Sequence, residues 1–198
     1  MNFPLRCNCG SVEGYLASPH RAARAICYCR DCQAFARYLG KPAQTLNALG
    51  GTDVVATSPR HVHITRGLEH LRCMSLSEKG ILRWYAGCCR TPIGNTPRDP
   101  KVPYISLVHN CLAGSYAEIN AAFGPARVAV NTGSARGKVS PTPWATFRAV
   151  LKIVRNVSGS RLSGKYKENP FFRQDVAEPI VAPHVLSSPE RRALRGDA

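Results

Sequence analysis

The chain has 198 residues, of which 44% are hydrophobic, and its formal net charge is +15 at pH 7. A chain of this length can bury one substantial core, and this apolar fraction is enough to form it. Its apolar runs fall well short of the ~18 to 20 residues needed to span a bilayer, so we exclude a transmembrane helix and expect no membrane partner.

The first motif is Cys7-Asn-Cys9-Gly10, close to the start of the chain. Residues that lie two apart on an extended segment face the same side, so both thiolates can reach one metal ion. Gly10 lets the backbone turn tightly behind them. Because no apolar segment precedes Cys7, we expect no signal peptide and a cytoplasmic protein with reduced thiols.

The second motif is Cys27-Tyr-Cys29-Arg-Asp-Cys32. This spacing wraps three sulfurs around one centre and leaves a tetrahedral ion one ligand short. We expect the following residues, Gln33 to Leu39, to form a helix that ends at Gly40. The motif would then lie at the N-terminus of that helix.

Further along the chain, short apolar runs alternate with polar residues and are broken by Gly, Pro, Asp or Asn. Such runs predict the strands of a mainly β, antiparallel core. The expected strands cover residues 54–57, 61–65, 71–75, 81–85 and 104–108.

The third motif is the adjacent pair Cys88-Cys89. Thiolates in these patterns favour zinc, which takes four protein ligands at a structural site and keeps a position open at a catalytic site. We therefore expect two zinc ions per chain, one at a closed site that joins the first and third motifs and one at a three-thiolate site. The expected metal ligands are Cys7, Cys9, Cys27, Cys29, Cys32, Cys88 and Cys89.

Three other interpretations of the cysteines are weaker. Disulfides are disfavoured by the odd count of nine cysteines and by the expected compartment. The familiar spacings of iron–sulfur ligands are missing. A redox pair of Cys29 and Cys32 would need a βαβ setting, and the third thiol at Cys27 favours metal. Cys73 and Cys111 stand alone, and we expect them to be small buried apolar residues.

From Ser115 onward the chain predicts helices rather than strands. Ser115-x-x-Glu118 is a capping-box pattern, and Gly124-Pro125 ends the helix that it starts. Residues 132–143 have the composition of a linker. An amphipathic helix is expected over residues 143–156, and a short one near the C-terminus. The apolar face of the longer helix consists of Trp144, Phe147, Val150, Leu151 and Val154.

We expect this amphipathic helix to pack on the zinc domain or on a second subunit. The chain is accordingly divided into a zinc-binding β domain at residues 1–133 and a basic C-terminal extension at residues 134–198.

The three cysteine motifs, in this order, resemble the glutathione-dependent formaldehyde-activating enzyme family, which includes the centromere-protein-V relatives. The resemblance covers roughly the first two-thirds of the chain. It rests on Cys7-x-Cys9-Gly10-x-Val12-x-Gly14, Cys27-x-Cys29-x-x-Cys32-Gln33 and Arg83-Trp84-Tyr85-Ala86-Gly87-Cys88-Cys89-Arg90-Thr91-Pro92-Ile93-Gly94. It implies an Mss4-like β-tent of antiparallel sheets with a few short helices. It also implies a structural zinc at the first and last motifs and a catalytic zinc at the middle one, Cys27, Cys29 and Cys32.

Two positions depart from the family pattern, which usually ends in Phe-Cys-x-x-Cys-Gly. Ala86 stands at the first cysteine of that motif and Arg90 at its glycine. Either Cys88 is the fourth ligand, or the closed site has only three protein sulfurs. In the middle motif, Tyr28 stands where the family usually has His. The resemblance is therefore to a divergent member.

The resemblance implies a zinc-dependent carbon–sulfur lyase, similar to S-hydroxymethylglutathione synthase. Its substrates would be glutathione-type thiol adducts of small aldehydes such as formaldehyde, with glutathione as a co-substrate. Arg24, Arg30 and Arg37 are candidates to grip substrate carboxylates. His109 is the histidine candidate for acid–base chemistry.

The charge supports an alternative of another class. Residues 136–198 carry 12 basic and 5 acidic side chains, and residues 1–135 carry 15 and 7, so both parts are positive. A basic surface attracts nucleic acid, and it equally steers an anionic thiol to an active site. The alternative is a non-catalytic zinc module that binds nucleic acid or a protein partner.

Overall fold

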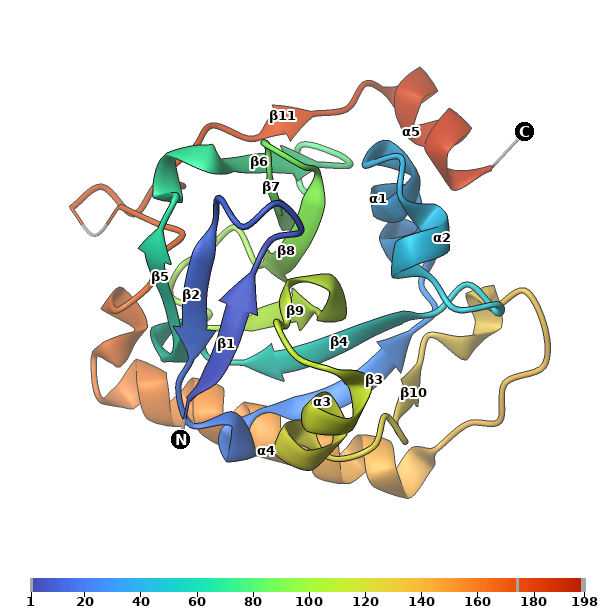
Figure 1. Ribbon diagram of the computed structural model, residues 1–198, viewed down its shortest axis with the longest axis horizontal. Helices are drawn as coiled ribbons and strands as arrows, with labels where there is room; N and C mark the ends of the chain where they lie inside the picture. The colour runs from blue at the N-terminus through green and yellow to red at the C-terminus, as the bar shows by residue number, and fades with distance from the viewer. Residues whose placement is uncertain (1, 174, 197–198) are drawn as a thin grey trace.

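Two β-sheets form the body of the protein in this computed structural model, which describes residues 2–173 and 175–196 (Figure 1). The smaller sheet has the order β1-β2-β5, with β1 at Phe3–Arg6, β2 at Glu13–Leu16 and β5 at Val62–Arg66. The larger sheet has the order β10-β3-β4-β9-β8-β7-β6-β11. Its strands are β3 (Ala23–Cys27), β4 (Thr52–Thr57), β6 (Leu71–Ser75), β7 (Leu82–Ala86), β8 (Thr91–Thr96), β9 (Ile105–Val108), β10 (Ala129–Val130) and β11 (His184–Val185).

The prediction of a mainly β protein is confirmed, and the long strands pair in antiparallel fashion. At the two edges of the larger sheet the prediction of antiparallel pairing is wrong. There, β10 pairs with β3 and β11 pairs with β6 in parallel. Both edge strands are two residues long and come from distant parts of the chain, so no hairpin dictates their direction.

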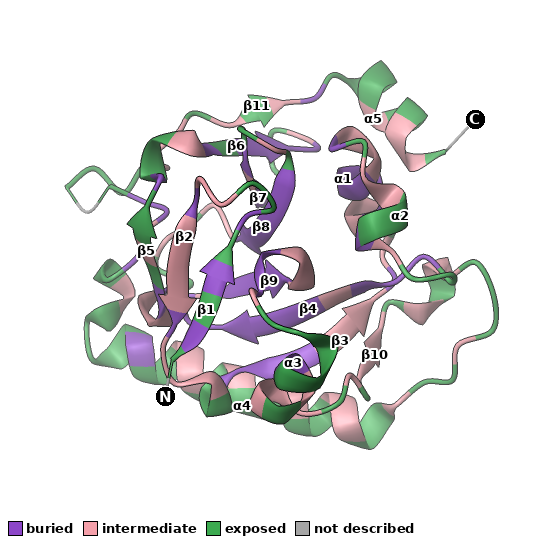
Figure 2. Ribbon diagram, in the orientation of Figure 1, coloured by how far each residue is buried: buried purple, intermediate pink, exposed green. Residues whose placement is uncertain are grey.

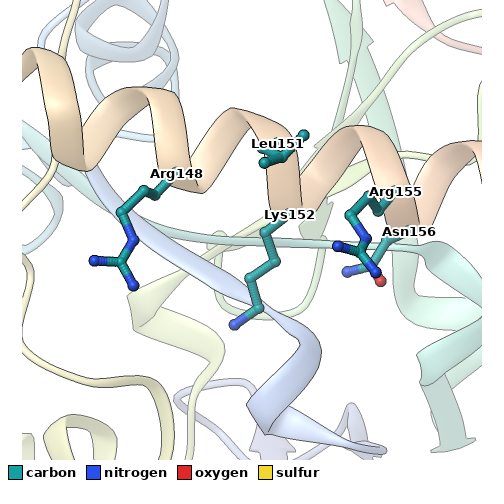
Figure 3. A pocket seen from close by; sticks show the side chains of 5 residues that line it. All are labelled: Arg148, Leu151, Lys152, Arg155 and Asn156. Atoms are coloured by element: carbon teal, nitrogen blue, oxygen red, sulfur yellow. The ribbon is translucent and has the colours of Figure 1, made fainter.

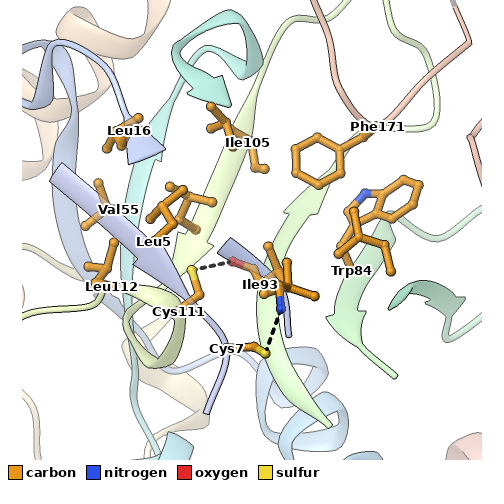
Figure 4. Packing of buried hydrophobic residues seen from close by; sticks show 14 of the residues in the cluster. Leu5, Cys7, Leu16, Val55, Trp84, Ile93, Ile105, Cys111, Leu112 and Phe171 are labelled. Atoms are coloured by element: carbon orange, nitrogen blue, oxygen red, sulfur yellow. Dashed lines mark hydrogen bonds between the residues drawn. The ribbon is translucent and has the colours of Figure 1, made fainter. Parts of the chain in front are cut away.

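The main hydrophobic core lies between the two sheets (Figure 4). The small sheet contributes Phe3, Leu5 and Leu16 from alternate positions of its strands. The large sheet contributes residues that include Val55 and Trp84, which is fully buried. Strand periodicity places every second side chain on this face, so the remaining side chains of the large sheet point to its other face.

That other face carries the features that matter for function. A row of register partners crosses it from strand to strand: Ala23 on β3, Ala56 on β4, Ser106 on β9, Asn95 on β8 and Arg83 on β7. The row is apolar over β3 and β4 and polar over β9, β8 and β7. Helices α1 (Arg30–Tyr38) and α4 (Pro143–Leu162) contact this side of the sheet.

The described residues also form three further α-helices and several short 3₁₀ helices. The α-helices are α2 (Pro42–Thr45), α3 (Tyr116–Phe123) and α5 (Ser188–Arg195). The 3₁₀ helices are η1 (Pro19–Arg21), η2 (Pro59–His61), η3 (Leu68–His70), η4 (His109–Cys111), η5 (Thr132–Ser134) and η6 (Lys165–Lys167). The capping box of Ser115 and Glu118 is present at the start of α3, and Gly124 ends that helix with a φ of +78°, as predicted.

The helix after the second cysteine motif begins earlier than predicted, at Arg30 rather than Gln33. Cys29 is its N-cap, because the Cys29 side chain accepts a hydrogen bond from the backbone N–H of Cys32. The motif is thus built into the first helical turn.

Helix α4 extends to Leu162, beyond the predicted end at residue 156. The helix packs against β3 and β4, so the prediction that it contacts the zinc domain is met, and the alternative of a second subunit stays a prediction. The packed face is not the expected apolar one, because Trp144 is 79% and Phe147 59% accessible. Exposed and half-buried residues alternate along α4 (Figure 2). The opposite face packs instead. There, the Lys152 Nζ donates to the Ala22 carbonyl at 2.6 Å, and the Ser160 hydroxyl lies 3.1 Å from that of Ser58. Small and polar side chains on this face permit the close approach.

The C-terminal extension packs into the rest of the chain after α4. Phe171 and Phe172 join the main core, where Phe171 is fully buried and its ring lies 5.0 Å from that of Trp84. Strand β11 then completes the edge of the larger sheet. The division at residue 133 stays a prediction. None of the helices in the described part of the chain is long and apolar enough to cross a membrane.

Candidate metal centres

The first and third cysteine motifs meet in one four-sulfur cluster. The Sγ atoms of Cys7, Cys9, Cys88 and Cys89 all lie within 4.8 Å of one another. Cys7 Sγ is 3.6 Å from Cys9 Sγ and 3.9 Å from Cys88 Sγ, and Cys9 Sγ is 3.3 Å from Cys88 Sγ. A tetrahedral zinc with Zn–S bonds of ~2.3 Å holds its sulfurs ~3.8 Å apart. The arrangement therefore fits one zinc ion, with Cys88 among the grouped sulfurs.

Two turns bring these sulfurs together. The turn after β1 places Cys7 and Cys9 on one side, with the Gly10 N–H donating to the Cys7 carbonyl at 2.9 Å and Gly10 at a φ of +79°. The turn between β7 and β8 contains Cys88 and Cys89 and closes through Arg90, whose N–H donates to the Ala86 carbonyl. This turn lets adjacent cysteines face one point.

Neighbouring groups support the sulfurs of this cluster. The backbone N–H of Val12 donates to Cys7 Sγ at 3.3 Å, and the Thr91 hydroxyl lies 3.0 Å from Cys89 Sγ. Hydrogen bonding with Ser11 lowers the pKa of Cys9 to about 6. Donors around the sulfurs of a metal site orient them and stabilise their charge.

The second cluster contains only three sulfurs. The Sγ atoms of Cys27, Cys29 and Cys32 lie within 4.8 Å of one another, with 3.8 Å between Cys32 and Cys27. Cys27 ends β3, and the other two belong to the cap and first turn of α1. A helix N-terminus favours negative charge, so it stabilises thiolates here.

Asn131 is a fourth member of this cluster that the sequence did not indicate. Its side-chain amide donates to Cys27 Sγ at 3.3 Å. Strand β10 places it there, because Val130 is the register partner of Cys27, and Asn131 then turns back with a φ of +55°. Asparagine tolerates this left-handed conformation better than most residues, which is the only local signal for it.

The three thiols do not ionise alike. Hydrogen bonds from Cys29 and Cys32 lower the pKa of Cys27 to about 2. The same contacts raise the pKa of Cys29 and raise that of Cys32 further. Cys27 is therefore the first of the three thiols to ionise, and a cation bound by all three would displace their remaining protons.

A cavity of about 580 Å³ opens beside this second cluster. Its polar lining comes from the three cysteines together with Arg83, Asn95, Tyr104, Ser106, Asp31, Lys79 and Asn131. Its apolar lining comes from β3, β4, the segment around β10 and the inner face of α4. Burial raises the pKa of the Tyr104 phenol, so this group stays a hydrogen-bond donor at neutral pH.

Arg83 is the most unusual residue of the cavity wall. Its guanidinium is almost completely buried and donates to Asn95 Oδ1 at 3.0 Å, while Asn95 donates to the Ser106 hydroxyl at 3.2 Å. The nearest carboxylate is that of Asp31, at 3.8 Å. The buried Arg83 Nε has no hydrogen-bond partner among the described residues. A buried donor without a partner is costly, and the rest of the Arg83 side chain lines the cavity.

The arginines and the histidine singled out from the sequence lie elsewhere or are engaged. Arg24 is buried and pairs with Asp53 at 2.6 Å, and Arg37 donates to the Leu194 carbonyl. His109 contacts the Asp53 carbonyl at 3.4 Å and lines a different cavity from the three-sulfur cluster. The sequence placed Arg30 close to the motif, and it is the first residue of α1.

The remaining sequence-predicted residues are buried. Tyr28 packs in the interior, with 6% of its surface exposed. Cys73 and Cys111 are buried as predicted, and burial raises the pKa of each thiol to about 12.

A family model described as a family of unknown function (DUF6151) matches residues 1–181. The chain belongs to this family. The DUF6151 match includes both cysteine clusters, Asn131, Arg83 and helix α4, so every element of the cavity lies within it. The residues beyond the match hold β11 and α5.

Comparison with solved structures finds the crystal structure of a Rhodobacter sphaeroides protein. The two proteins are 18% identical in sequence, and their structures match with a TM-score of 0.39. The match covers 59% of this DUF6151 protein and 93% of the Rhodobacter sphaeroides chain. No curated protein matches the chain.

Proposed function

We propose that the protein binds two zinc ions and is a carbon–sulfur lyase that acts on glutathione-type thiol adducts of small aldehydes. The observation that carries this proposal is the contrast between its clusters. Cys7, Cys9, Cys88 and Cys89 supply a complete tetrahedral set, whereas Cys27, Cys29 and Cys32 supply three sulfurs in the wall of a cavity. A closed set is typical of structural zinc and an incomplete set of catalytic zinc.

We also propose which enzyme family the protein is related to and where in the cell it works. The cysteine motifs support a divergent relationship to the glutathione-dependent formaldehyde-activating enzymes and an Mss4-like tent of sheets. The sequence supports a cytoplasmic protein. Both clusters fit zinc by their donor chemistry, because soft thiolates at mutual distances near ~3.8 Å match a tetrahedral sulfur site.

The chemistry joins a thiol to an aldehyde. The thiol sulfur bonds to the carbonyl carbon, the carbon–oxygen π pair moves to oxygen, and the thiol proton ends on that oxygen; the reverse reaction breaks the carbon–sulfur bond. A zinc ion held by Cys27, Cys29 and Cys32 would supply Lewis acidity, which favours the thiolate form of an incoming thiol. Three anionic protein sulfurs make such an ion a better holder of thiols than an activator of carbonyl groups.

The residues around the cavity supply the remaining functions. The Tyr104 phenol is a protonated donor that can stabilise charge on the aldehyde oxygen. The guanidinium of Arg83, which lines the cavity, can bind a carboxylate of the thiol. The apolar walls from β3, β4 and α4 exclude water from the reacting atoms.

The test combines zinc content with thiol binding. We expect two zinc ions per chain by elemental analysis, and one in Cys29→Ser with the fold retained by circular dichroism. In the cobalt-substituted protein, glutathione should change the sulfur-to-metal charge-transfer band, and it should not do so in Cys29→Ser. Exchange between formaldehyde and its glutathione adduct, followed by NMR, should be faster with the intact protein.

Two zinc ions that do not respond to thiols, in a protein retained on DNA or RNA in a salt-sensitive way, would contradict the proposal. That outcome would favour the non-catalytic zinc module.

A further inference from the structure

The outer face of α4 is an apolar stripe that nothing in the described chain covers. Trp144, Phe147, Leu151 and Val154 recur at intervals of three and four residues and so share one side of the helix. Their exposed fractions are 79%, 59%, 47% and 51%. Leu162, at the end of the same side, is 89% exposed. A contiguous exposed apolar stripe of this kind marks an interaction site.

Basic side chains border this stripe. Arg148, Lys152 and Arg155 extend from one side of α4, next to Leu151 (Figure 3). Lys152 is held by the Ala22 carbonyl, whereas Arg148 and Arg155 have no hydrogen bond or ion pair with the described residues. Between Glu118 and Glu168 the chain has nine Lys and Arg residues and no Asp or Glu. The surroundings of α4 therefore attract anions over a long stretch of sequence.

Three occupants differ in how well they match this surface. A second copy of the chain would bring two identical basic borders together, with no acidic residue from this stretch to pair with them. A nucleic acid would satisfy the arginines but would leave Trp144, Phe147 and Leu151 in water. A bilayer with anionic lipids satisfies both, because apolar side chains enter the acyl boundary while arginines reach the phosphates.

Contrary to the expectation from the sequence that the protein has no membrane partner, we infer that the outer face of α4 binds the surface of an anionic membrane, with the helix lying parallel to the bilayer. The helix is already formed and fixed to the protein on its other side, by Lys152, Asn156 and Ser160, so binding does not have to order it. The apolar side chains supply one part of the affinity and the basic residues the other. This inference is independent of the zinc chemistry.

The chain contains its own reporter for this binding. Of its two tryptophans, Trp84 is fully buried and Trp144 is exposed, so a change in fluorescence on binding comes from Trp144. The zinc-loaded full chain is titrated with vesicles of phosphatidylcholine alone or with about 30% phosphatidylserine, at about 0.1 M salt. We expect a blue shift and co-sedimentation only with the anionic vesicles.

Matched substitutions separate the two contributions. Leu151→Glu should lower the affinity for anionic vesicles at least about tenfold, and the double variant Arg148→Glu, Arg155→Glu should do the same. The controls are Leu68→Glu, at an apolar residue of η3 that is 45% exposed, and Arg192→Glu on α5, which lies across the molecule from α4 (Figure 1). Both should bind like the unmodified chain, and all variants should keep its melting temperature.

Four results would overturn the inference. The first is no binding to either kind of vesicle, and the second is binding that Leu151→Glu leaves unchanged. The third is a stable dimer that Leu151→Glu dissociates, since it would assign the stripe to a second copy of the chain. Preferential retention on RNA or DNA, lost in the double arginine variant but kept in Leu151→Glu, would likewise replace the membrane with a nucleic acid.

Discussion

Arg90 shows how one residue can carry the strain of a metal-binding turn. It has a φ of +56°, in the left-handed region that non-glycine residues avoid, and it directly follows Cys88 and Cys89. Its guanidinium lies 5.9 Å from the centre of the Tyr38 ring, which offsets part of the strain through a cation–π contact. The turn geometry brings Cys88 and Cys89 together, and the strained backbone of Arg90 is its local energetic cost.

Two substitutions at Arg90 separate these effects. Arg90→Ala removes the contact with Tyr38 but keeps the strain, whereas Arg90→Gly removes both. We expect the free energy of unfolding of Arg90→Gly to exceed that of Arg90→Ala by about 1 kcal/mol in urea titrations of the zinc-loaded protein. Equal stabilities of the two variants would show that the backbone is not strained at this position.

His61 links stability to pH. Burial, with help from Arg60 and Arg21, lowers its pKa to about 4 from the ordinary value of 6.5, and its Nε2 has no partner among the described residues. The folded protein therefore holds His61 neutral, while the unfolded chain takes up a proton as the pH falls below 6.5. Stability from this group is complete above pH 6.5 and is lost as the pH falls toward 4.

The variant His61→Gln cannot take up this proton. The stability of the unmodified protein relative to His61→Gln should thus decrease from pH 6.5 to 4 and then level off, as measured by urea unfolding at each pH. Acid release of metal affects both proteins alike and cancels in the difference. Parallel stability curves would refute the assignment.

At this scale the sequence predicted the chemistry of the cysteines better than that of their partners. The spacing alone predicted that Cys27, Cys29 and Cys32 lie together, because all three fall within six consecutive residues. Arg83, Asn95 and Asn131 could not be found that way, since strand register and a parallel edge pairing bring them to the cavity. Of the arginines chosen for closeness in sequence, Arg24 pairs with Asp53 and Arg37 donates to the Leu194 carbonyl.

Among the elements, α5 lies next to the three-sulfur cluster, because it packs against α1. Arg195 near its end pairs with Asp31 in the first turn of α1, and Asp31 also lies 3.8 Å from Arg83. Arg37 of α1 donates to the Leu194 carbonyl. The C-terminal helix is thus tied to the helix that carries Cys32.

The start of α5 can be weakened without touching these contacts. Ser187 is its N-cap and forms a capping box with Glu190. We expect Ser187→Ala to lower the free energy of unfolding by about 1 kcal/mol and to raise amide exchange rates in α5. Ser188→Ala, one residue inside the helix, is the matched control and should change neither.

Interrupted alternation explains several of the strands that the sequence analysis did not predict. The predicted strands correspond to β4, β5, β6, β7 and β9. Strands β1, β2, β3 and β8 were not predicted, because proline, glycine and arginine interrupt their alternation. Their positions are set by pairing with neighbours rather than by local preference.

For the whole molecule, the core depends on both ends of the chain. Phe171 packs against Trp84 in the main core and is fully buried. We expect Phe171→Ala to lower the free energy of unfolding by about 3–5 kcal/mol. Phe147→Ala is the control, since Phe147 is 59% exposed and its loss should be nearly neutral. Similar urea midpoints for the two variants would exclude a core role for the C-terminal part.

The two clusters should differ in what their metal contributes to stability. Cys9 joins turns from different sheets, 79 residues from Cys88, while Cys27 and Cys32 are only 5 residues apart. Closing the longer loop restricts the unfolded chain more. We expect Cys9→Ser to lower the melting temperature more than Cys29→Ser, although each variant retains one zinc. The reverse order would show that the second cluster holds the fold together.

The separation between the paired sulfurs also bears on the synthesis of the protein. A ribosome releases Cys7 and Cys9 well before Cys88, which is 81 residues after Cys7, and the core aromatic Phe171 emerges later still. A nascent chain therefore carries two unsatisfied thiols for much of its translation. Until Cys88 and Cys89 have been made, these two thiols lack the partners that complete the four-sulfur cluster.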